Sequence, residues 1–256
     1  MLLYLGVMVA LPFLVLLWNS FLPFYMKPTL GALSKLTLEN YAFVFSLPKT
    51  SRAIINSIFL STGSATIILV LTSVLAWIVV RTRFAGRWVL DNLASLPLIF
   101  PGVVMGVALI WVYLTLPIPI YGTIWILMVA YVTRYLPYGM RACSSALVQI
   151  HHELEEAAEA SGASWGQTFR LIVLPLLRPA LLAGWIYVVI VSIRELSSSI
   201  FLWGPGAEVL SVIIFDFWQS GHAQELAALG IMLILVLFIL AILSRRLSQR
   251  YGVQHN

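Results

Sequence analysis

The chain has 256 residues, of which 61% are hydrophobic and only 10% are charged, and its mean hydropathy is +0.98. A soluble domain of this length could not keep its surface hydrated with so few charges, so the composition excludes an ordinary soluble protein. The formal net charge is +5, but the basic residues lie at the ends of apolar segments. This placement indicates the charge bias of a membrane protein rather than a surface that binds nucleic acid.

Several apolar segments are about as long as the roughly 20 residues that a helix needs to cross a bilayer. Unpaired backbone groups are costly in hydrocarbon, so spanning segments are helices or closed barrels, and long continuous apolar runs favour helices. The sequence therefore predicts an all-α, polytopic membrane protein with about six transmembrane helices. The predicted spans are Leu2–Tyr25, Ala53–Val80, Leu90–Leu116, Tyr121–Tyr138, Ala180–Trp203 and Leu226–Leu243.

The third predicted span contains Pro97, Pro101, Gly102 and Gly106. Proline removes a backbone donor and collides with the preceding turn, so we expect this helix to be bent.

The basic residues predict the orientation of the chain. Nine arginines lie at one set of span ends and four basic residues lie at the other, so the first set is expected in the cytoplasm. The loop 139–179 and the C-terminus would then be cytoplasmic, and residues 26–52 and 203–223 would face outward. The first set is Arg81, Arg83, Arg87, Arg141, Arg170, Arg178, Arg245, Arg246 and Arg250, and the second is Lys27, Lys35, Lys49 and Arg52.

The predicted cytoplasmic loop has the pattern of two short helices joined at a glycine. Residues 152–161 are good helix formers with acids in the first turns, and Gly162 follows where a left-handed cap would end the helix. Ser164 and Gln167 form a capping box for a second helix. Its apolar stripe is Trp165, Phe169 and Ile172, and we expect Leu174-Pro175 to end it. On these residues alone, a plain amphipathic hairpin at the membrane surface remains an alternative.

The residues Glu156-Ala157-Ala158, Gly162 and Ile172-Val173-Leu174-Pro175 have the spacing EAA-x3-G-x9-I-x-LP. This pattern resembles the cytoplasmic EAA loop of permease subunits of ABC-type importers with the type I fold. The resemblance implies that the loop is the seat of the ATPase subunit. The residues to which it assigns this coupling role are Glu156, Ala157, Ala158, Gly162, Ile172, Leu174 and Pro175.

The resemblance also implies partners and a location. We expect a dimer of ABC ATPase subunits, a second permease half that is identical or different, a periplasmic or extracellular substrate-binding protein, and a bilayer, but no nucleic acid. The location would be the bacterial inner membrane. Residues 1–256 would form a single transmembrane permease domain. Some members of the family fuse two halves, and this chain carries one EAA loop, so it would be one half of a longer permease.

The segments Arg134–Gly139, Arg194–Ser199 and Gly204–Ser211 are similar to the iron(III)-type branch of these permeases. The resemblance implies ferric iron as the substrate. Neighbouring branches carry phosphonates, sulfate-like anions and polyamines, so these substrates stay open as alternatives.

Ionisable residues within spans are costly and usually face protein or water with a partner. For Arg134 we favour an ion pair between helices or a side chain that reaches the cytoplasmic edge. For Arg194 and Glu195, a substrate path and a structural pair remain equally open, and the nearby serines would serve either the path or helix packing. The candidate path residues are Arg194, Glu195, Ser197, Ser198 and Ser199.

No phosphate-binding loop ending in Gly-Lys-Ser/Thr occurs, so ATP hydrolysis is expected in a separate chain and this chain is not expected to be an enzyme. We predict no catalytic residue, cofactor or metal site, because the adjacent His151 and His152 point apart on a helix and Cys143 is the single cysteine. The competing function classes are an ATPase-independent channel or secondary carrier, and a membrane scaffold protein.

Overall fold

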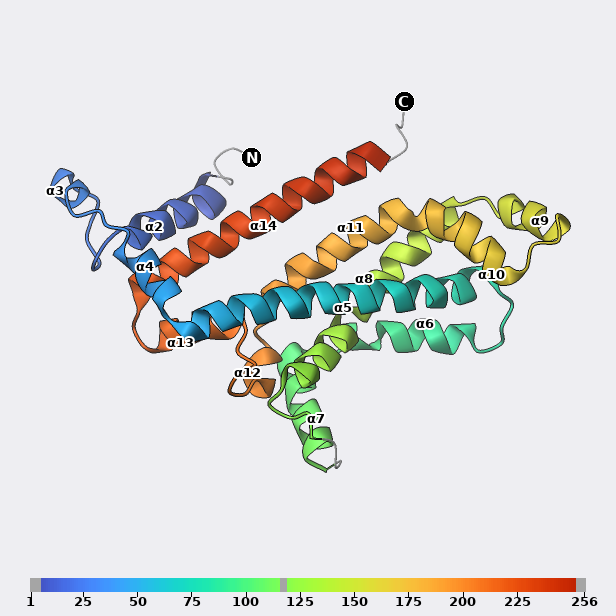
Figure 1. Cartoon of the computed structure of the whole chain (residues 1–256), viewed down its shortest axis with the longest axis horizontal. Helices are drawn as coiled ribbons and strands as arrows, with labels where there is room; N and C mark the ends of the chain where they lie inside the picture. The colour runs from blue at the N-terminus through green and yellow to red at the C-terminus, as the bar shows by residue number, and fades with distance from the viewer. Residues whose placement is uncertain (1–5, 116–118, 252–256) are drawn as a thin grey trace.

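In a computed structural model, residues 6–115 and 119–251 of the chain are described, and every regular element among them is helical. Four long helices dominate the structure (Figure 1). They are α5 (Pro48–Arg81), α8 (Ile124–Gln149), α11 (Leu174–Ile193) and α14 (Ala223–Tyr251).

Shorter elements connect these four helices or extend them. The N-terminal elements are η1 (Gly6–Ala10), α2 (Leu11–Ser20), α3 (Leu30–Leu33) and α4 (Glu39–Ser46). Between α5 and α8 lie α6 (Arg87–Ser95), η2 (Leu96–Leu98) and α7 (Gly102–Thr115). The remaining short elements are α9 (Glu153–Ala160), α10 (Trp165–Thr168), η3 (Phe169–Val173), α12 (Ser199–Leu202) and α13 (Leu210–Gln219).

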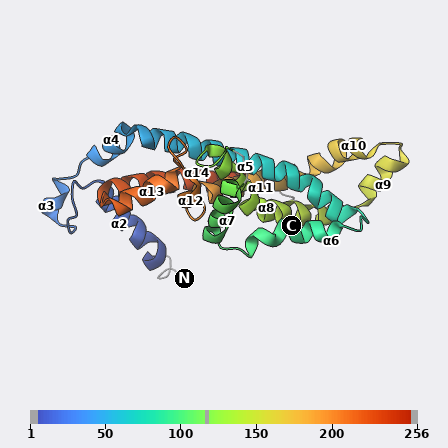
Figure 2. The same cartoon turned by 90° about the horizontal axis from the view of Figure 1, so that it is seen from below.

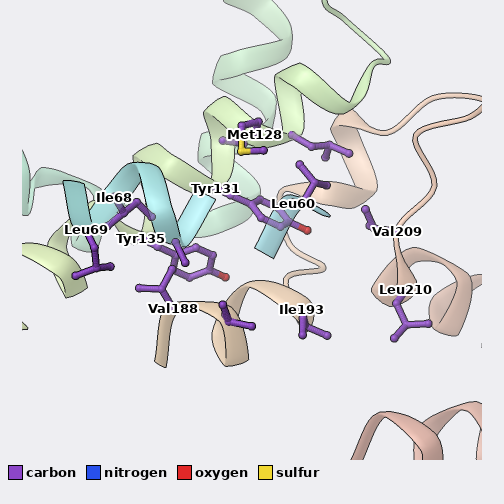
Figure 3. Packing of buried hydrophobic residues seen from close by; sticks show 14 of the residues in the cluster. Leu60, Ile68, Leu69, Met128, Tyr131, Tyr135, Val188, Ile193, Val209 and Leu210 are labelled. Carbon is purple, nitrogen blue, oxygen red and sulfur yellow. The ribbon is translucent and has the colours of Figure 1, made fainter. Parts of the chain in front are cut away.

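The core lies where α5, α8 and α11 pack against one another. Figure 3 shows Tyr131 and Tyr135 of α8 lying among apolar side chains of α5 and α11, such as Ile68 and Val188. Small residues bring the backbones close, since a Cβ on Gly139 would collide with Ile68 and Thr72. Such close approach is typical of helix packing in membranes, where lipid and protein are equally apolar.

The two predicted outer segments lie at one end of α5, and the predicted cytoplasmic loop lies at the other end (Figures 1 and 2). The segment that leads into α5 lies near α13 at one end, where Lys49 pairs with Asp216 at 2.6 Å and Arg52 with Glu208 at 3.4 Å. Helices α9 and α10 lie at the other end. This arrangement agrees with the expectation that the two predicted outer segments, 26–52 and 203–223, share one side.

Three helical stretches are long and apolar enough to cross a membrane, and a fourth would be the broken pair α6–η2 and α7 if it counts as one span. The three are Pro48–Arg81, Trp165–Ile193 and Ala223–Leu243. The stretch Gly6–Ser20 is shorter, and residues 2–5 of the first predicted span and Leu116 of the third lie outside the described residues. The count of six therefore stays a prediction, whereas the all-α, multi-helix membrane fold is confirmed.

Two span predictions need correction. The third span is not one bent helix, because Arg87–Leu98 and Gly102–Thr115 meet at 107°. Pro97 and Pro101 both interrupt the backbone ladder within this short stretch, so a full break replaces a bend. The fifth helix was predicted over Ala180–Trp203, but it runs without interruption from Trp165 and ends at Ile193.

Candidate functional site

The loop with the EAA pattern forms a helical hairpin, here called the EAA hairpin, which comprises α9, the turn after it and α10 (residues 153–168). The turn is a Schellman motif, in which the Gly162 N–H donates to the Glu159 carbonyl at 2.9 Å and the Ala163 N–H to the Ala158 carbonyl at 3.0 Å. Gly162 has a φ of +81°, in the left-handed region that favours glycine. The predicted glycine stop of the first helix is confirmed.

The second arm begins as expected with a capping box between Ser164 and Gln167. The Ser164 N–H donates to the Gln167 side-chain oxygen at 2.7 Å. The predicted end at Leu174-Pro175 is wrong, because α10, η3 and α11 form one continuous helix. Pro175 is accommodated directly after the π-helical turn Phe169–Val173, whose wider hydrogen-bond spacing suits a proline that has no N–H to donate.

The motif residues divide between two environments. Glu156 and Ala157 are exposed on α9, Ala158 is half-buried, and Gly162 is exposed, with room around it for a Cβ. Glu156 lies 3.2 Å from His152 Nδ1 one turn earlier. The second group, Ile172, Leu174 and Pro175, is half-buried on the continuous helix. The hairpin therefore exposes its acidic, small-residue face on the surface of the protein, away from the other helices.

A buried cluster that the sequence did not reveal joins the EAA hairpin to α5. Glu155 is only 4% exposed, and its carboxylate lies 2.8 Å from Arg81 Nε of α5. The Nε–H does not point at that oxygen, so the contact is an ion pair rather than a hydrogen bond. Trp77 Nε1 donates to the other carboxylate oxygen at 3.0 Å. The available signal was the spacing of Trp77 and Arg81, which puts both on one face of α5.

The candidate substrate-path residues lie at a second helix break, directly after α11. Arg194 caps the helix with φ −92° and ψ 3° and is exposed. Glu195, Ser198 and Ser199 are buried, and Ser197 is half-buried. The five residues are therefore close in space. The prediction that they lie on one membrane-spanning helix is wrong, because α11 ends before them.

Glu195 is the centre of a polar cluster, here called the Glu195 cluster, that it forms with Arg134, Tyr135 and Ser198. One carboxylate oxygen lies 2.9 Å from Arg134 Nε and accepts the Tyr135 hydroxyl at 2.5 Å. The other oxygen accepts the Ser198 N–H at 2.9 Å and its hydroxyl at 3.1 Å. The carboxylate thus provides an acceptor for the Ser198 N–H in the break after α11. The ion pair that we favoured for Arg134 is present, but its partner Glu195 lies in the break after α11 rather than on a second helix.

The two helix breaks touch each other. A Cβ on Gly102, the first residue of α7, would collide with the Arg134 guanidinium and with Ser197. One on Gly106 would press on the Ser198 backbone at 3.3 Å. The break between α6 and α7 therefore packs directly on the break after α11.

At the opposite end of α5, Asn56 and Ser57 hold the segment before α13. The Asn56 amide donates to the carbonyls of Gly206 and Glu208 at 3.0 and 2.8 Å, and Ser57 Oγ accepts the Leu210 N–H at 2.8 Å. Burial would raise the pKa of the Glu208 carboxyl, but backbone N–H groups at 206 and 208 and the Arg52 charge outweigh it and lower that pKa. The beginning of α5 and the segment that leads into α13 are therefore joined in space.

Among residues 6–115 and 119–251, no group of three His, Cys, Asp or Glu side chains is placed to hold a metal ion. Cys143 is buried beside Thr72, with 3.6 Å between Sγ and Oγ1.

Comparison with known proteins identifies the family. The sequence pattern of the family described as "binding-protein-dependent transport system inner membrane component" matches residues 68–253, which is most of the chain. The chain belongs to this family. It is therefore a membrane permease subunit of a transport system and not an enzyme.

Two relatives of the binding-protein-dependent permease family carry different substrates. The chain is 33% identical over 205 residues to the ferric transport system permease protein FbpB of Actinobacillus pleuropneumoniae, covering 79% of this chain but only 30% of that protein. It is 28% identical over 241 residues to the spermidine/putrescine transport system permease protein PotC of Haemophilus influenzae, covering 94% of this chain and 91% of that protein. The chain thus spans about a third of the ferric relative and nearly all of the polyamine relative.

Solved structures of ABC importers have the same fold as this permease. A chain of the bacterial alginate ABC transporter, in complex with an alginate-bound periplasmic protein, superposes with a TM-score of 0.78 over 97% of this chain and 91% of that chain, at 16% identity. A chain of the MetNI methionine ABC transporter superposes with a TM-score of 0.62 over 79% of this chain and 96% of that chain, at 17% identity. At these identities the likeness establishes the fold alone.

Proposed function

We propose that this permease forms one half of the translocation pathway of an ATP-driven importer, with its EAA hairpin as the docking element for the ATPase. The observation that carries the proposal is the exposed acidic face of α9, together with the turn at Gly162 that follows this helix. Small residues allow a partner to approach closely, and exposed carboxylates such as Glu156 can meet basic side chains of that partner. Family membership favours this role over an ATPase-independent channel or secondary carrier and over a scaffold.

The partners that follow are a dimer of ABC ATPase subunits at the EAA hairpin, a second permease half and a substrate-binding protein at the opposite end. Large apolar side chains such as Trp111 and Leu114 of α7 are exposed, which is consistent with cover from lipid or a second half. Residues 1–256 would act as one transmembrane permease domain, whether the second half is a separate chain or fused to this one. In the orientation predicted from the basic residues, the loop 139–179 and the C-terminus face the cytoplasm.

For the substrate we propose ferric iron carried together with anions. The support is the 33% identity to the ferric permease and the charge near the second helix break. Arg194 is an exposed cation there, while the nearby acid, Glu195, is already paired with Arg134 and Tyr135. A polyamine is a cation that carries no anions with it, and it would find no unpaired carboxylate in the Glu195 cluster.

A polyamine is the second candidate, because the match to PotC covers nearly the whole length of that protein. The two candidates differ in the expected role of Arg194. An arginine on the path would attract an anionic iron complex and would repel a polyamine.

The test is uptake into proteoliposomes that hold the permease with its ATPase and second half, with the substrate-binding protein added outside. Labelled ferric citrate, putrescine, a phosphonate and sulfate are supplied in turn, and uptake is divided by the complex recovered. We expect ferric uptake, lowered at least about tenfold by Arg194→Ala and largely kept by Arg194→Lys. Unchanged uptake per complex in Arg194→Ala would remove this residue from the path. Uptake of putrescine without iron would replace the substrate proposal and leave the permease proposal intact.

A further inference from the structure

The end of α5 nearest the EAA hairpin carries two side chains, Trp77 and Arg81, that contact the hairpin from within little more than one helical turn. Trp77 and Arg81 are four residues apart, so their side chains leave α5 from the same face. Both reach the carboxylate of Glu155, which is only 4% exposed. A buried carboxylate is costly unless it is paired, so these two side chains largely determine where α9 can sit.

Arg81 also fixes the end of the helix that precedes the hairpin. Its terminal nitrogen Nη2 donates to the carbonyls of Leu147 at 2.9 Å and Ile150 at 2.5 Å, at the C-terminal end of α8. The Leu147 carbonyl also accepts the Ile150 N–H at 3.1 Å, and a cation at this C-terminal end is favoured by the helix dipole. One guanidinium therefore holds α8, α9 and α5 together.

Trp77 reaches the second arm of the EAA hairpin as well. Its ring lies edge-on to Trp165 with 5.2 Å between centroids, and edge-on to Phe169 at 6.5 Å. Trp165 and Phe169 stack on each other at 5.7 Å. Trp77 thus bonds the first arm through its N–H and packs on the second arm through its ring.

Helix α5 extends for 34 residues from this cluster to the far end of the molecule. There Asn56 and Ser57 hold the segment 206–210 by three hydrogen bonds. A rigid helix attached at both ends moves its far contacts whenever its near end is displaced.

We propose that Trp77, Arg81 and Glu155 form the joint through which displacement of the EAA hairpin is passed to α5. The three are positioning residues, and the proposal rests on the coupling role of the hairpin proposed above. Glu156 and Gly162 would meet the ATPase, whereas the joint faces away from it and makes both arms follow α5 as one body.

The joint can be tested by distance measurement between spin labels on α5 and on α10. Val70→Cys is exposed on α5, and a side chain at Gly166→Cys would meet nothing within 4 Å, so both accept a label in a Cys143→Ser background. In the assembled complex we expect one narrow distance, equal in the nucleotide-free state and with ATP and vanadate. Glu155→Gln should broaden this distribution and make it depend on nucleotide, while the matched control Glu153→Gln, an exposed acid on the same helix, should not.

A second readout separates positioning from mere stability. In the proteoliposomes described above, ATP hydrolysed per labelled ferric citrate or putrescine imported should rise about fivefold in Glu155→Gln, which is the lower range of coupling between sites. Trp77→Phe keeps the ring contacts and loses only the N–H, so it should give a smaller rise. A purely structural role would lower the amount of complex and leave this ratio unchanged.

A narrow, nucleotide-independent distance in Glu155→Gln, with an unchanged ratio, would overturn the joint. If Glu155→Gln fails to assemble, the double variant Arg81→Met/Glu155→Gln removes both charges and keeps the site filled, and a narrow distance in that variant also overturns the proposal. Failure of the unsubstituted permease to bind any ATPase would instead overturn the coupling role of the hairpin. The distance in the permease by itself would then still decide whether the joint holds the hairpin on α5.

Discussion

At the scale of single residues, Gly162 combines two properties that usually go separately. Its φ of +81° is one that few side chains adopt, yet a Cβ at this position would meet nothing within 4 Å. The chain itself therefore has room for a larger residue, and a substitution acts through the backbone and through whatever docks there.

A graded series at Gly162 separates these effects. Asparagine visits the left-handed region readily, so Gly162→Asn should keep the turn. Gly162→Ala should cost about 1–2 kcal/mol of local stability in the hairpin. Gly162→Asp should insert normally but bind the ATPase weakly, because it adds charge to a contact that favours small residues. Co-purification of the ATPase with each variant measures the order, and equal binding by Gly162→Asp would remove the turn from the docking surface.

The Glu195 cluster shows what a buried ion pair requires. Arg134 is about a quarter exposed and Glu195 almost fully buried, and the carboxylate has four polar contacts. Without Arg134, the hydrogen bonds from Tyr135 and Ser198 would remain. They would not neutralise the buried negative charge of Glu195, which would then be incompletely compensated.

A double-mutant cycle tests this dependence. Arg134→Met should destabilise the permease by about 3 kcal/mol, since Glu195 stays buried without its cation. Glu195→Gln should restore much of that loss, because the amide oxygen can still accept from Ser198 while the amide NH2 donates to the Tyr135 hydroxyl oxygen. Thermal unfolding in detergent measures the three variants. Additive losses in the double variant would mean that the two side chains do not stabilise each other.

At the scale of helical elements, the π-helical turn Phe169–Val173 decides where the second arm of the hairpin points. A π turn holds an extra residue, so its loss would rotate everything upstream by about 100°, the rotation of one helical residue. Trp165 would then turn away from Trp77, which it now meets at 5.2 Å.

Pro175→Ala tests this geometry, because alanine restores the N–H that the proline lacks. We expect a regular α-helix over 165–193, greater stability of the detergent-solubilised permease and weaker coupling of ATP hydrolysis to uptake. The distance between spin labels at Val70→Cys and Gly166→Cys should differ between the Pro175 and Pro175→Ala backgrounds. Equal distances would show that the proline does not maintain the turn.

Local chemistry made parts of these elements predictable. The glycine stop, the capping box and the acidic first turn of α9 depend on neighbouring residues, and each was readable from the sequence. The break after Ile193 was not, because the Glu195 carboxylate in it is paired with Arg134, which is 61 positions away in sequence. The burial of Glu155 likewise depends on Arg81, which is distant in sequence. The continuity of α10 with α11 was missed because proline signals a helix end unless a wider turn admits it.

At the scale of the whole molecule, the fold class and the membrane location followed from apolar length and low charge. Exact spans did not, since helix ends here depend on packing: α8 continues to Gln149, well past the predicted end at Tyr138. The orientation is a prediction from the nine-to-four distribution of basic residues.

Cysteine labelling in intact cells tests the orientation. Cys143 is buried and can be replaced by serine, which keeps a hydroxyl beside Thr72. A membrane-impermeant maleimide should label Lys35→Cys and should miss Ser164→Cys until the cells are opened. Labelling of Ser164→Cys in intact cells would reverse the assignment of the two sides.

The pairing of Arg134 with Glu195 also has a consequence for synthesis of the protein. An arginine at the centre of a span costs about 2.5–3.5 kcal/mol on insertion scales, and α8 carries Arg134 within its apolar stretch. Accordingly, α8 is not among the described helices that are apolar enough to cross a membrane by composition. Because Glu195 is made about sixty residues later, α8 would leave the ribosome before its counter-charge exists. Stable placement of α8 would therefore wait for the segment that follows α11, so α8 would settle only after the next long helix has been made.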